Sequence, residues 1–127
     1  MRLAQRPRDH HLVAFADPAV LTAAATRLGL PLHLVDAEDA SDAPGTLGLV
    51  PLPHACPVEP GRLEPANAPA VIAALAAAAD ACLAGRYDGL VTGPVHKGVV
   101  NEAGIAYTGT TELLAQRAGC DVVMMLG

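Results

Sequence analysis

The apolar positions in the first third of the chain follow the order strand, helix, strand. Residues 11–16 (HLVAFA) form a short apolar run that fits a buried strand, and Asp17-Pro18 directly after it is a favourable helix start. Apolar residues then recur at helical spacing up to Leu28, and Gly29 supplies a stop. Residues 32–35 predict a second strand. This order with short turns is typical of a parallel sheet.

The middle of the chain combines loop signals with one long helix. Residues 36–45 are acidic and rich in small residues, which predicts a surface loop, and residues 46–51 indicate a third strand. Six prolines between positions 51 and 69 exclude a regular helix through that stretch. Residues 69–84 then predict an Ala-rich helix. It is apolar on nearly every side, so burial within this chain and partial cover by another subunit both fit.

The last third places two polar turns between two apolar strands. Residues 89–91 and 122–126 predict the strands, and the loop that starts at Thr92 would leave the carboxyl end of a sheet, where open α/β folds bind ligands. Between the strands we expect a short helix over 97–103 and a second helix that Thr110 or Thr111 caps and that ends before Gly119.

Together these elements predict an α/β chain with a mostly parallel sheet, and residues 1–127 form one such segment. The length suits a single domain. Because the chain ends inside the last predicted strand, we expect the segment to belong to a larger subunit.

Composition narrows the class of protein. A hydrophobic content of 52% with 17% charged residues argues against disorder, and a net charge of -5 without a basic stripe argues against nucleic-acid binding. The three cysteines show no CxxC pairing and are expected to be reduced thiols. The basic N-terminus lacks the apolar core of a signal peptide, and the longest apolar run, residues 70–79, is too short to span a membrane. We therefore expect a soluble, cytoplasmic protein with no membrane partner.

His96 and Lys97 are the first candidates for chemistry. Lys97 is the only lysine, whereas the other seven basic residues are arginines. A compact ammonium suits a phosphate or a carboxylate and can be tuned for proton transfer, and His96 would serve as an anion ligand or as a general acid or base. The alternative is that His96 and Lys97 are simply two basic residues that face the solvent and belong to no binding site.

The second candidate is the turn Thr108-Gly109-Thr110-Thr111 at the start of a predicted helix. Hydroxyl groups and free backbone N–H groups converge at such a turn, and the helix dipole favours an anion there. An ordinary helix cap has the same composition, so both explanations stay open. Only a short helix separates this turn from His96 and Lys97, so the two could face one anionic substrate.

Other functional motifs are absent from the sequence. The remaining histidines and cysteines show no metal-site spacing, and we assign no metal to this chain. Neither a GxGxxG fingerprint nor a GxxxxGK[ST] loop occurs.

These motifs resemble the 4-hydroxythreonine-4-phosphate dehydrogenase family. The resemblance covers essentially the whole chain, including the scaffold from Ala14 to Leu32, and it is most specific in residues 92–99 (TGPVHKGV), Asn101, 103–105 (AGI), Thr108-Gly109, Thr111-Glu112 and 122–126 (VVMML).

The resemblance implies an enzyme that oxidises 4-phosphohydroxy-L-threonine with NAD or NADP in pyridoxal 5′-phosphate synthesis. The oxidised product decarboxylates to 3-amino-2-oxopropyl phosphate. The implied fold is three-layered and similar to isocitrate and isopropylmalate dehydrogenases, with two α/β domains per subunit in a homodimer. A divalent metal (Zn, Mg or Co) held by histidines is implied as a Lewis acid. In the family, the residues matching Thr110 and Thr111 contact the substrate, and we expect His96 and Lys97 to line the same site.

The chain departs from the family pattern in two ways. The family has His in the turn where this chain has Thr110, and its metal-binding histidines lie beyond the position of Gly127. The metal and cofactor sites are therefore incomplete, and we expect no turnover by this chain alone. Two alternatives remain: a non-catalytic binding module of the same fold, or a related dehydrogenase for another acidic or phosphorylated hydroxy acid.

Overall fold

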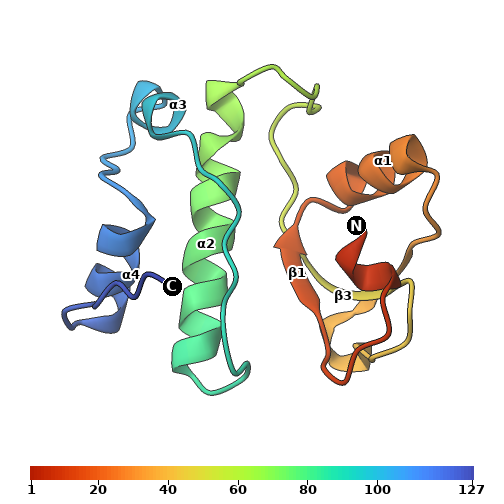
Figure 1. Ribbon diagram of the computed structural model, residues 1–127. Helices are drawn as coiled ribbons and strands as arrows, with labels where there is room; N and C mark the ends of the chain where they lie inside the picture. The colour runs from red at the N-terminus through yellow and green to blue at the C-terminus, as the bar shows by residue number, and fades with distance from the viewer. The chain divides into compact units, whose positions relative to one another are not determined.

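The computed structural model describes residues 1–127, which divide into an N-terminal unit, Met1–His54, and a C-terminal unit, Ala55–Gly127 (Figure 1). The N-terminal unit contains every strand of the protein. In chain order its elements are η1 (Leu3–Gln5), β1 (Val13–Ala16), α1 (Pro18–Leu28), β2 (His33–Asp36), η2 (Ala37–Asp39) and β3 (Thr46–Pro51).

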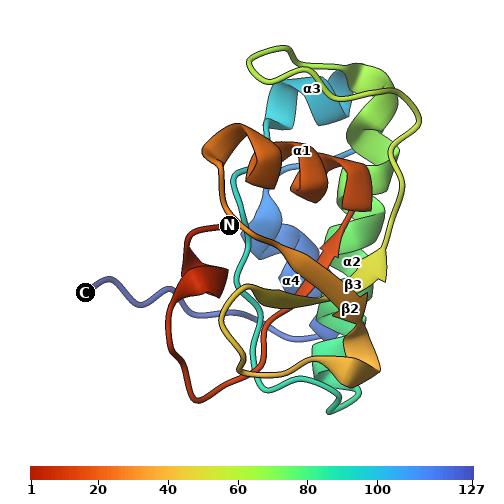
Figure 2. The same ribbon diagram turned by 90° about the vertical axis from the view of Figure 1, so that its right-hand side faces the viewer.

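The three strands form one parallel sheet in the order β1-β3-β2. The chain crosses from β1 through α1 to β2 and then returns to place β3 between them, and α1 lies beside the sheet (Figure 2). Strand, helix and strand in parallel arrangement confirm the α/β class that the apolar pattern predicts. Short strands of this kind are stabilised by the central strand, whose backbone groups pair on both sides.

Gly48 allows β3 to occupy the centre of the sheet. It pairs with Val13 on one side and Val35 on the other. A Cβ at position 48 would lie 2.8 Å from the Cβ of Ala40 and 3.1 Å from Cγ2 of Val13. The chain after η2 therefore packs directly onto the backbone of β3, which only a residue without a side chain permits.

Arg8 ties the N-terminal segment to the loop before β3. Its guanidinium donates to the carbonyl oxygens of Ala4 at 2.8 Å, Ser41 at 3.1 Å, Ala43 at 3.4 Å and Thr46 at 2.7 Å. Several donors on one planar group can serve carbonyls that point toward a common centre. The basic N-terminus is thus part of the folded unit.

The C-terminal unit consists of helices and their connections. Its elements are η3 (Pro65–Asn67), α2 (Ala68–Leu83), α3 (Lys97–Glu102) and α4 (Thr110–Ala118). The buried residues Ala68, Val100 and Tyr107 form its core, and the partly buried side chains around them are Ile72, Val95, Ala103, Ile105 and Leu113. The core thus links α2, α3 and the start of α4.

Arg117 and Asp80 join α4 to the far end of α2. Nε of Arg117 donates to Oδ1 of Asp80 at 2.8 Å, and a second guanidinium nitrogen donates to Oδ2. This bond lowers the pKa of the Asp80 carboxyl and raises the pKa of Arg117. Leu75 and Ala79 of α2 are buried, whereas Leu83 at the end of the helix is 58% exposed.

Two predicted strands, residues 89–91 and 122–126, do not form. Val91 is 96% exposed and Met125 is 93% exposed. A strand needs a neighbour to accept and donate its backbone hydrogen bonds, and the C-terminal unit contains no strand. An apolar run alone is therefore not enough to form a strand here. The prediction that Thr92 follows the carboxyl end of a sheet strand is wrong as well.

Three helix ends agree with the sequence signals. Asp17 caps α1 by accepting the Ala19 N–H at 2.8 Å, and Gly29 and Gly119 end α1 and α4 in the left-handed conformation with φ of 64° and 66°. The predicted short helix and the long Ala-rich helix are present as α3 and α2.

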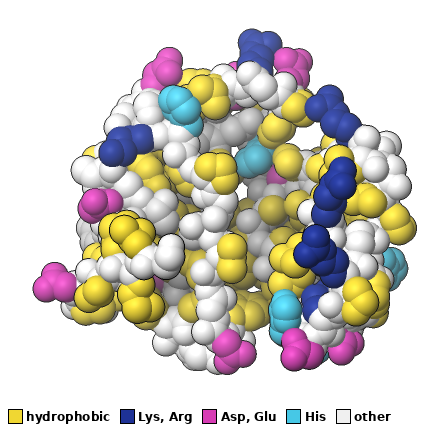
Figure 3. Space-filling model, viewed as in Figure 1, with side chains coloured by type: hydrophobic (Ala, Val, Ile, Leu, Met, Phe, Trp, Pro, Cys, Tyr) yellow, Lys and Arg dark blue, Asp and Glu magenta, His cyan; other side chains and the backbone are white.

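One helical stretch, Pro65–Leu83, is long and apolar enough to cross a membrane by length and composition alone. Core helices of soluble proteins share these features, so the stretch is weak evidence for a membrane span. Hydrophobic side chains also reach the surface at many scattered points on the face drawn in Figure 3.

Candidate functional site

The first turn of α4 carries the two threonines that the sequence singles out. Gly109 is the N-cap residue in an extended conformation, and Thr110 and Thr111 are the first two residues of the helix. No side chain caps this end, so the prediction that Thr110 or Thr111 is the cap is wrong. The free N–H groups of the first turn and the half-buried hydroxyl of Thr110 thus remain together at one helix end.

Tyr107 explains why Thr110 does not act as a cap. The phenolic oxygen of Tyr107 lies 2.7 Å from Oγ1 of Thr110. Tyr107 is 6% exposed, and its ring belongs to the core between α2 and α3. Its backbone N–H donates to Oδ1 of Asn101 at 3.0 Å. The core therefore fixes the tyrosine, and the tyrosine holds the threonine hydroxyl.

His96 and Lys97 lie at the start of α3. Nδ1 of His96 accepts the Val99 N–H at 3.2 Å, which makes His96 the N-cap of this short helix. The neutral ring then carries its hydrogen on Nε2, because Nδ1 acts as acceptor. Lys97 is the first residue of the helix, and both side chains are exposed. His96 thus has a structural role, and Nε2 and the Lys97 ammonium are left for a ligand.

The structure does not join the two candidate pairs directly. No hydrogen bond or ion pair connects His96 or Lys97 with Thr110 or Thr111. The carboxylate of Glu112 lies over Gly109, where a Cβ would be 2.5 Å from Oε2. Negative charge is favourable at this helix end, so an anionic ligand there would take the place of that carboxylate.

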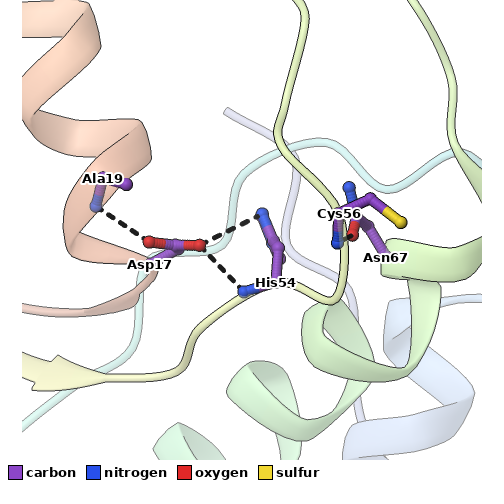
Figure 4. Close-up of polar contacts among 5 residues, drawn as sticks. All are labelled: Asp17, Ala19, His54, Cys56 and Asn67. Atoms are coloured by element: carbon purple, nitrogen blue, oxygen red, sulfur yellow. Dashed lines mark hydrogen bonds and ion pairs between the residues drawn. The ribbon is translucent and has the colours of Figure 1, made fainter.

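A second polar cluster lies where β1 and β3 end. Asp17 follows β1, and its Oδ2 accepts the backbone N–H of His54 at 2.8 Å (Figure 4). The N–H groups of His54 and then Ala19 hold the pKa of the Asp17 carboxyl below its ordinary value. Nδ1 of His54 is buried without a hydrogen-bond partner, 3.9 Å from Oδ2 of Asp17. This pair links the two strand ends.

Asn67 holds the start of the C-terminal unit in the same manner. It is 7% exposed, and its Oδ1 accepts the backbone N–H of Cys56 at 2.8 Å (Figure 4). The bond fixes the Pro-rich segment against η3, in a stretch where prolines remove backbone donors.

The metal implied by the family resemblance does not fit the residues of this chain. No group of three or more His, Cys, Asp or Glu side chains is arranged to hold a metal ion. His54 lies beside one carboxylate only, and His96 caps a helix. The groups that the two candidate pairs present are hydroxyl, backbone N–H, imidazole and ammonium groups.

The parallel sheet with its helices defines an α/β protein, and comparisons with known proteins supply the family. Residues 8–127 match the family model described as pyridoxal phosphate biosynthetic protein PdxA, and the chain belongs to this family. It is 58% identical over 127 residues to the 4-hydroxythreonine-4-phosphate dehydrogenase of Xanthomonas axonopodis pv. citri. The same identity is found with the enzyme of that name from Xylella fastidiosa (strain 9a5c).

These matches cover 99% of this chain but only 39% of the Xanthomonas protein and 38% of the Xylella protein. The chain thus spans about two fifths of the length of these relatives.

Two solved structures of 4-hydroxythreonine-4-phosphate dehydrogenases are also similar to part of this chain. A 4-hydroxythreonine-4-phosphate dehydrogenase from Burkholderia phymatum matches with a TM-score of 0.77 at 25% identity, over 94% of this chain and 36% of that chain. The enzyme of that name from Klebsiella pneumoniae matches with a TM-score of 0.73 at 26% identity, over 83% of this chain and 34% of that chain.

Sequence reasoning missed the residues that support the site. Asn101 accepts the backbone N–H of Tyr107, and Tyr107 is hydrogen-bonded to Thr110 in the threonine turn. Neither Tyr107 nor Asn101 has a sequence motif of its own. One signal was available: Tyr107 is one of only two tyrosines and directly precedes the turn at 108–111. The four predicted site residues His96, Lys97, Thr110 and Thr111 stay predictions for binding.

Proposed function

We propose that this chain forms the substrate-holding part of an NAD- or NADP-dependent 4-hydroxythreonine-4-phosphate dehydrogenase. The reaction removes a hydride from the hydroxyl-bearing carbon of 4-phosphohydroxy-L-threonine to the nicotinamide and a proton from the hydroxyl. The resulting 2-amino-3-oxo acid loses carbon dioxide to give 3-amino-2-oxopropyl phosphate, for pyridoxal 5′-phosphate synthesis. The observation that carries this proposal is the family match across residues 8–127, which includes the threonine turn.

The complete subunit would have the finer features that the family resemblance implies. These are the three-layer architecture of isocitrate and isopropylmalate dehydrogenases, with two domains per subunit, and a cytoplasmic homodimer. Residues 1–127 would be one α/β segment of that subunit. A divalent metal and the nicotinamide site would be completed by residues outside this chain, because no metal-binding group is present here.

Each of the four site residues has a role that its position permits. The Thr110 hydroxyl and the free N–H groups of the first α4 turn would hold the anionic end of the substrate, together with the exposed Thr111 hydroxyl. The Lys97 ammonium would neutralise phosphate charge, and Nε2–H of His96 would donate to the same group. These contacts bind and orient the substrate.

A chimera tests the proposal in a complete protein. The matching residues of the Xanthomonas axonopodis relative are replaced by this chain, and NAD(P)H formation from 4-phosphohydroxy-L-threonine is followed. Turnover by the chimera supports the proposal, and a folded chimera without turnover would count against it. This 127-residue chain alone, assayed with NAD or NADP and a divalent metal, is expected to be inactive.

Variants of the chimera test the assigned residues. Thr111→Val removes one hydroxyl and is expected to raise KM about three- to tenfold, since one hydrogen bond is lost. Lys97→Gln is expected to raise KM more than Lys97→Arg, which keeps the charge. Thr22→Val on the exposed face of α1 is the matched control and should leave KM unchanged.

Thr110 supports a second candidate within the same fold. The family resemblance places His at this position, and a hydroxyl there would suit a related dehydrogenase for another acidic or phosphorylated hydroxy acid. The lack of a metal-binding group in this chain also fits a non-catalytic binding module. Thr110→His in the chimera tests the related dehydrogenase. Unchanged affinity for 4-phosphohydroxy-L-threonine would exclude a role of Thr110 in substrate specificity. A chimera that binds the substrate without turnover would favour the binding module.

A further inference from the structure

We infer that Tyr107 is a positioning residue that orients the Thr110 hydroxyl as a hydrogen-bond donor toward the anionic group of the substrate. The inference rests on the proposed function, because it assigns a direction to one contact of the same site. It starts from the 2.7 Å separation between the Tyr107 phenolic oxygen and Oγ1 of Thr110. Either oxygen can donate in such a pair, and the two directions have different consequences for a ligand.

The surroundings of Tyr107 favour the direction from tyrosine to threonine. Tyr107 is 6% exposed, and the Thr110 oxygen is the only hydrogen-bond partner of its hydroxyl. If Thr110 donated, the tyrosine hydrogen would remain without an acceptor at the edge of an apolar core. Leaving a buried donor unpaired is unfavourable, whereas donation to Thr110 satisfies it.

Donation by Tyr107 leaves the hydrogen of Thr110 free. Thr110 is half-buried at the first position of α4, where the backbone N–H groups of the first turn also lack partners within the helix. A hydroxyl that already accepts one hydrogen bond points its own hydrogen elsewhere. The Thr110 hydroxyl and the N–H groups at the helix end thus all offer hydrogen-bond donors, which match the acceptor oxygens of a phosphate or a carboxylate.

The support behind Tyr107 makes this orientation rigid. Its ring packs with Ala68 and Val100 in the core of the C-terminal unit, and its backbone N–H is held by Asn101. A donor that is oriented before the ligand arrives loses less conformational freedom on binding than a free hydroxyl. The tyrosine therefore acts on the substrate through Thr110, without contact of its own.

The test uses the chimera described above, with the substrate dissociation constant and KM measured separately from kcat. Tyr107→Phe removes only the phenolic oxygen and keeps the ring in the core. It is expected to weaken substrate binding about three- to tenfold, and Thr110→Val should weaken it by a similar factor. The double variant should be little worse than Thr110→Val alone, because both changes remove one linked interaction. Thr110→Ser, which keeps the hydroxyl, should retain most of the affinity.

Tyr87→Phe is the matched control, since it removes the other tyrosine hydroxyl of the chain, outside the turn. It should leave substrate binding unchanged. The inference is overturned if Tyr107→Phe binds as tightly as the parent chimera, or if the effects of Tyr107→Phe and Thr110→Val multiply independently. If Tyr107→Phe fails to fold, equal binding by Thr110→Val and the parent overturns it instead. A parent chimera that binds no substrate rejects the proposed function itself, and this inference with it.

Discussion

The phenolic oxygen of Tyr107 and the hydroxyl oxygen of Thr110 lie 2.7 Å apart, and this contact connects the core of the C-terminal unit to the first turn of α4. A residue with 6% exposure is thereby hydrogen-bonded to a hydroxyl at the helix end. The free N–H groups of that turn need an acceptor, and the family to which the chain belongs is named for a phosphate-containing product.

Asn101 should be needed to keep Tyr107 in place. Asn101→Ala removes the acceptor of the Tyr107 N–H, and it is expected to lower the free energy of unfolding by about 1 kcal/mol. Amide exchange at Tyr107 should become faster. Asn101→Asp keeps an oxygen in the same position and serves as control. Equal exchange rates in Asn101→Ala and the parent chain would show that the bond does not hold the turn.

Gly48 should tolerate no side chain. Gly48→Ala places a methyl group 2.8 Å from Ala40, so the sheet or the segment after η2 has to move, at a cost of about 1–3 kcal/mol in unfolding free energy. Urea titration measures the change. Gly89→Ala, whose new methyl group meets nothing within 4 Å, is the control and should be nearly neutral. A neutral Gly48→Ala would contradict the packing of Ala40 on β3.

Arg8 should be irreplaceable by lysine despite the equal charge. Its guanidinium serves four carbonyl oxygens, and a single ammonium cannot reach all of them in the same geometry. Arg8→Lys is expected to cost about 2 kcal/mol in the stability of the N-terminal unit. Arg6→Lys changes an exposed arginine without such contacts and should have little effect. Thermal unfolding measures both effects, and equally small losses for the two variants would contradict the carbonyl contacts of Arg8.

Acid should weaken the link between Asp17 and His54. The pKa of Asp17 is lower in the folded chain than its ordinary value of 3.8, because the carboxylate accepts the His54 and Ala19 N–H groups. Its contribution to stability is therefore complete above about pH 4 and is lost as the pH falls through the lower folded pKa. Asp17→Asn should lower Tm by several degrees at pH 7 and by less near pH 2.

Asp42→Asn is the control for that experiment, because Asp42 forms no hydrogen bond or ion pair through its carboxylate. Its Tm difference from the parent should be small at both pH values. An Asp17→Asn difference that grows on acidification would mean that the folded chain prefers the protonated carboxyl.

The sequence predicted the elements whose signals are local. The Asp17-Pro18 start and the Gly29 stop define α1, and the spacing of apolar residues places β1 and β3 correctly. Such features depend on backbone groups within one or two turns, so neighbouring residues are enough to reveal them.

The failures concern features that depend on distant partners. Residues 89–91 and 122–126 have strand composition, but no strand of the C-terminal unit lies beside them. Thr110 resembles a helix cap until Tyr107 engages its hydroxyl. The role of Arg8 depends on carbonyls that are 33 to 38 residues away along the chain, at Ser41 and Thr46. Long-range contacts of this kind leave no periodic signal in the sequence.

The most direct test of the substrate-holding role is a ligand titration of the 127-residue chain followed by amide NMR. Addition of 4-phosphohydroxy-L-threonine should shift the resonances of Thr110, Thr111 and Lys97, and the same compound without its phosphate should shift them far less. Shifts that are equal for the two compounds, or that avoid the first turn of α4 while appearing elsewhere, would contradict the account. So would the absence of any shift at millimolar concentrations of the phosphorylated compound.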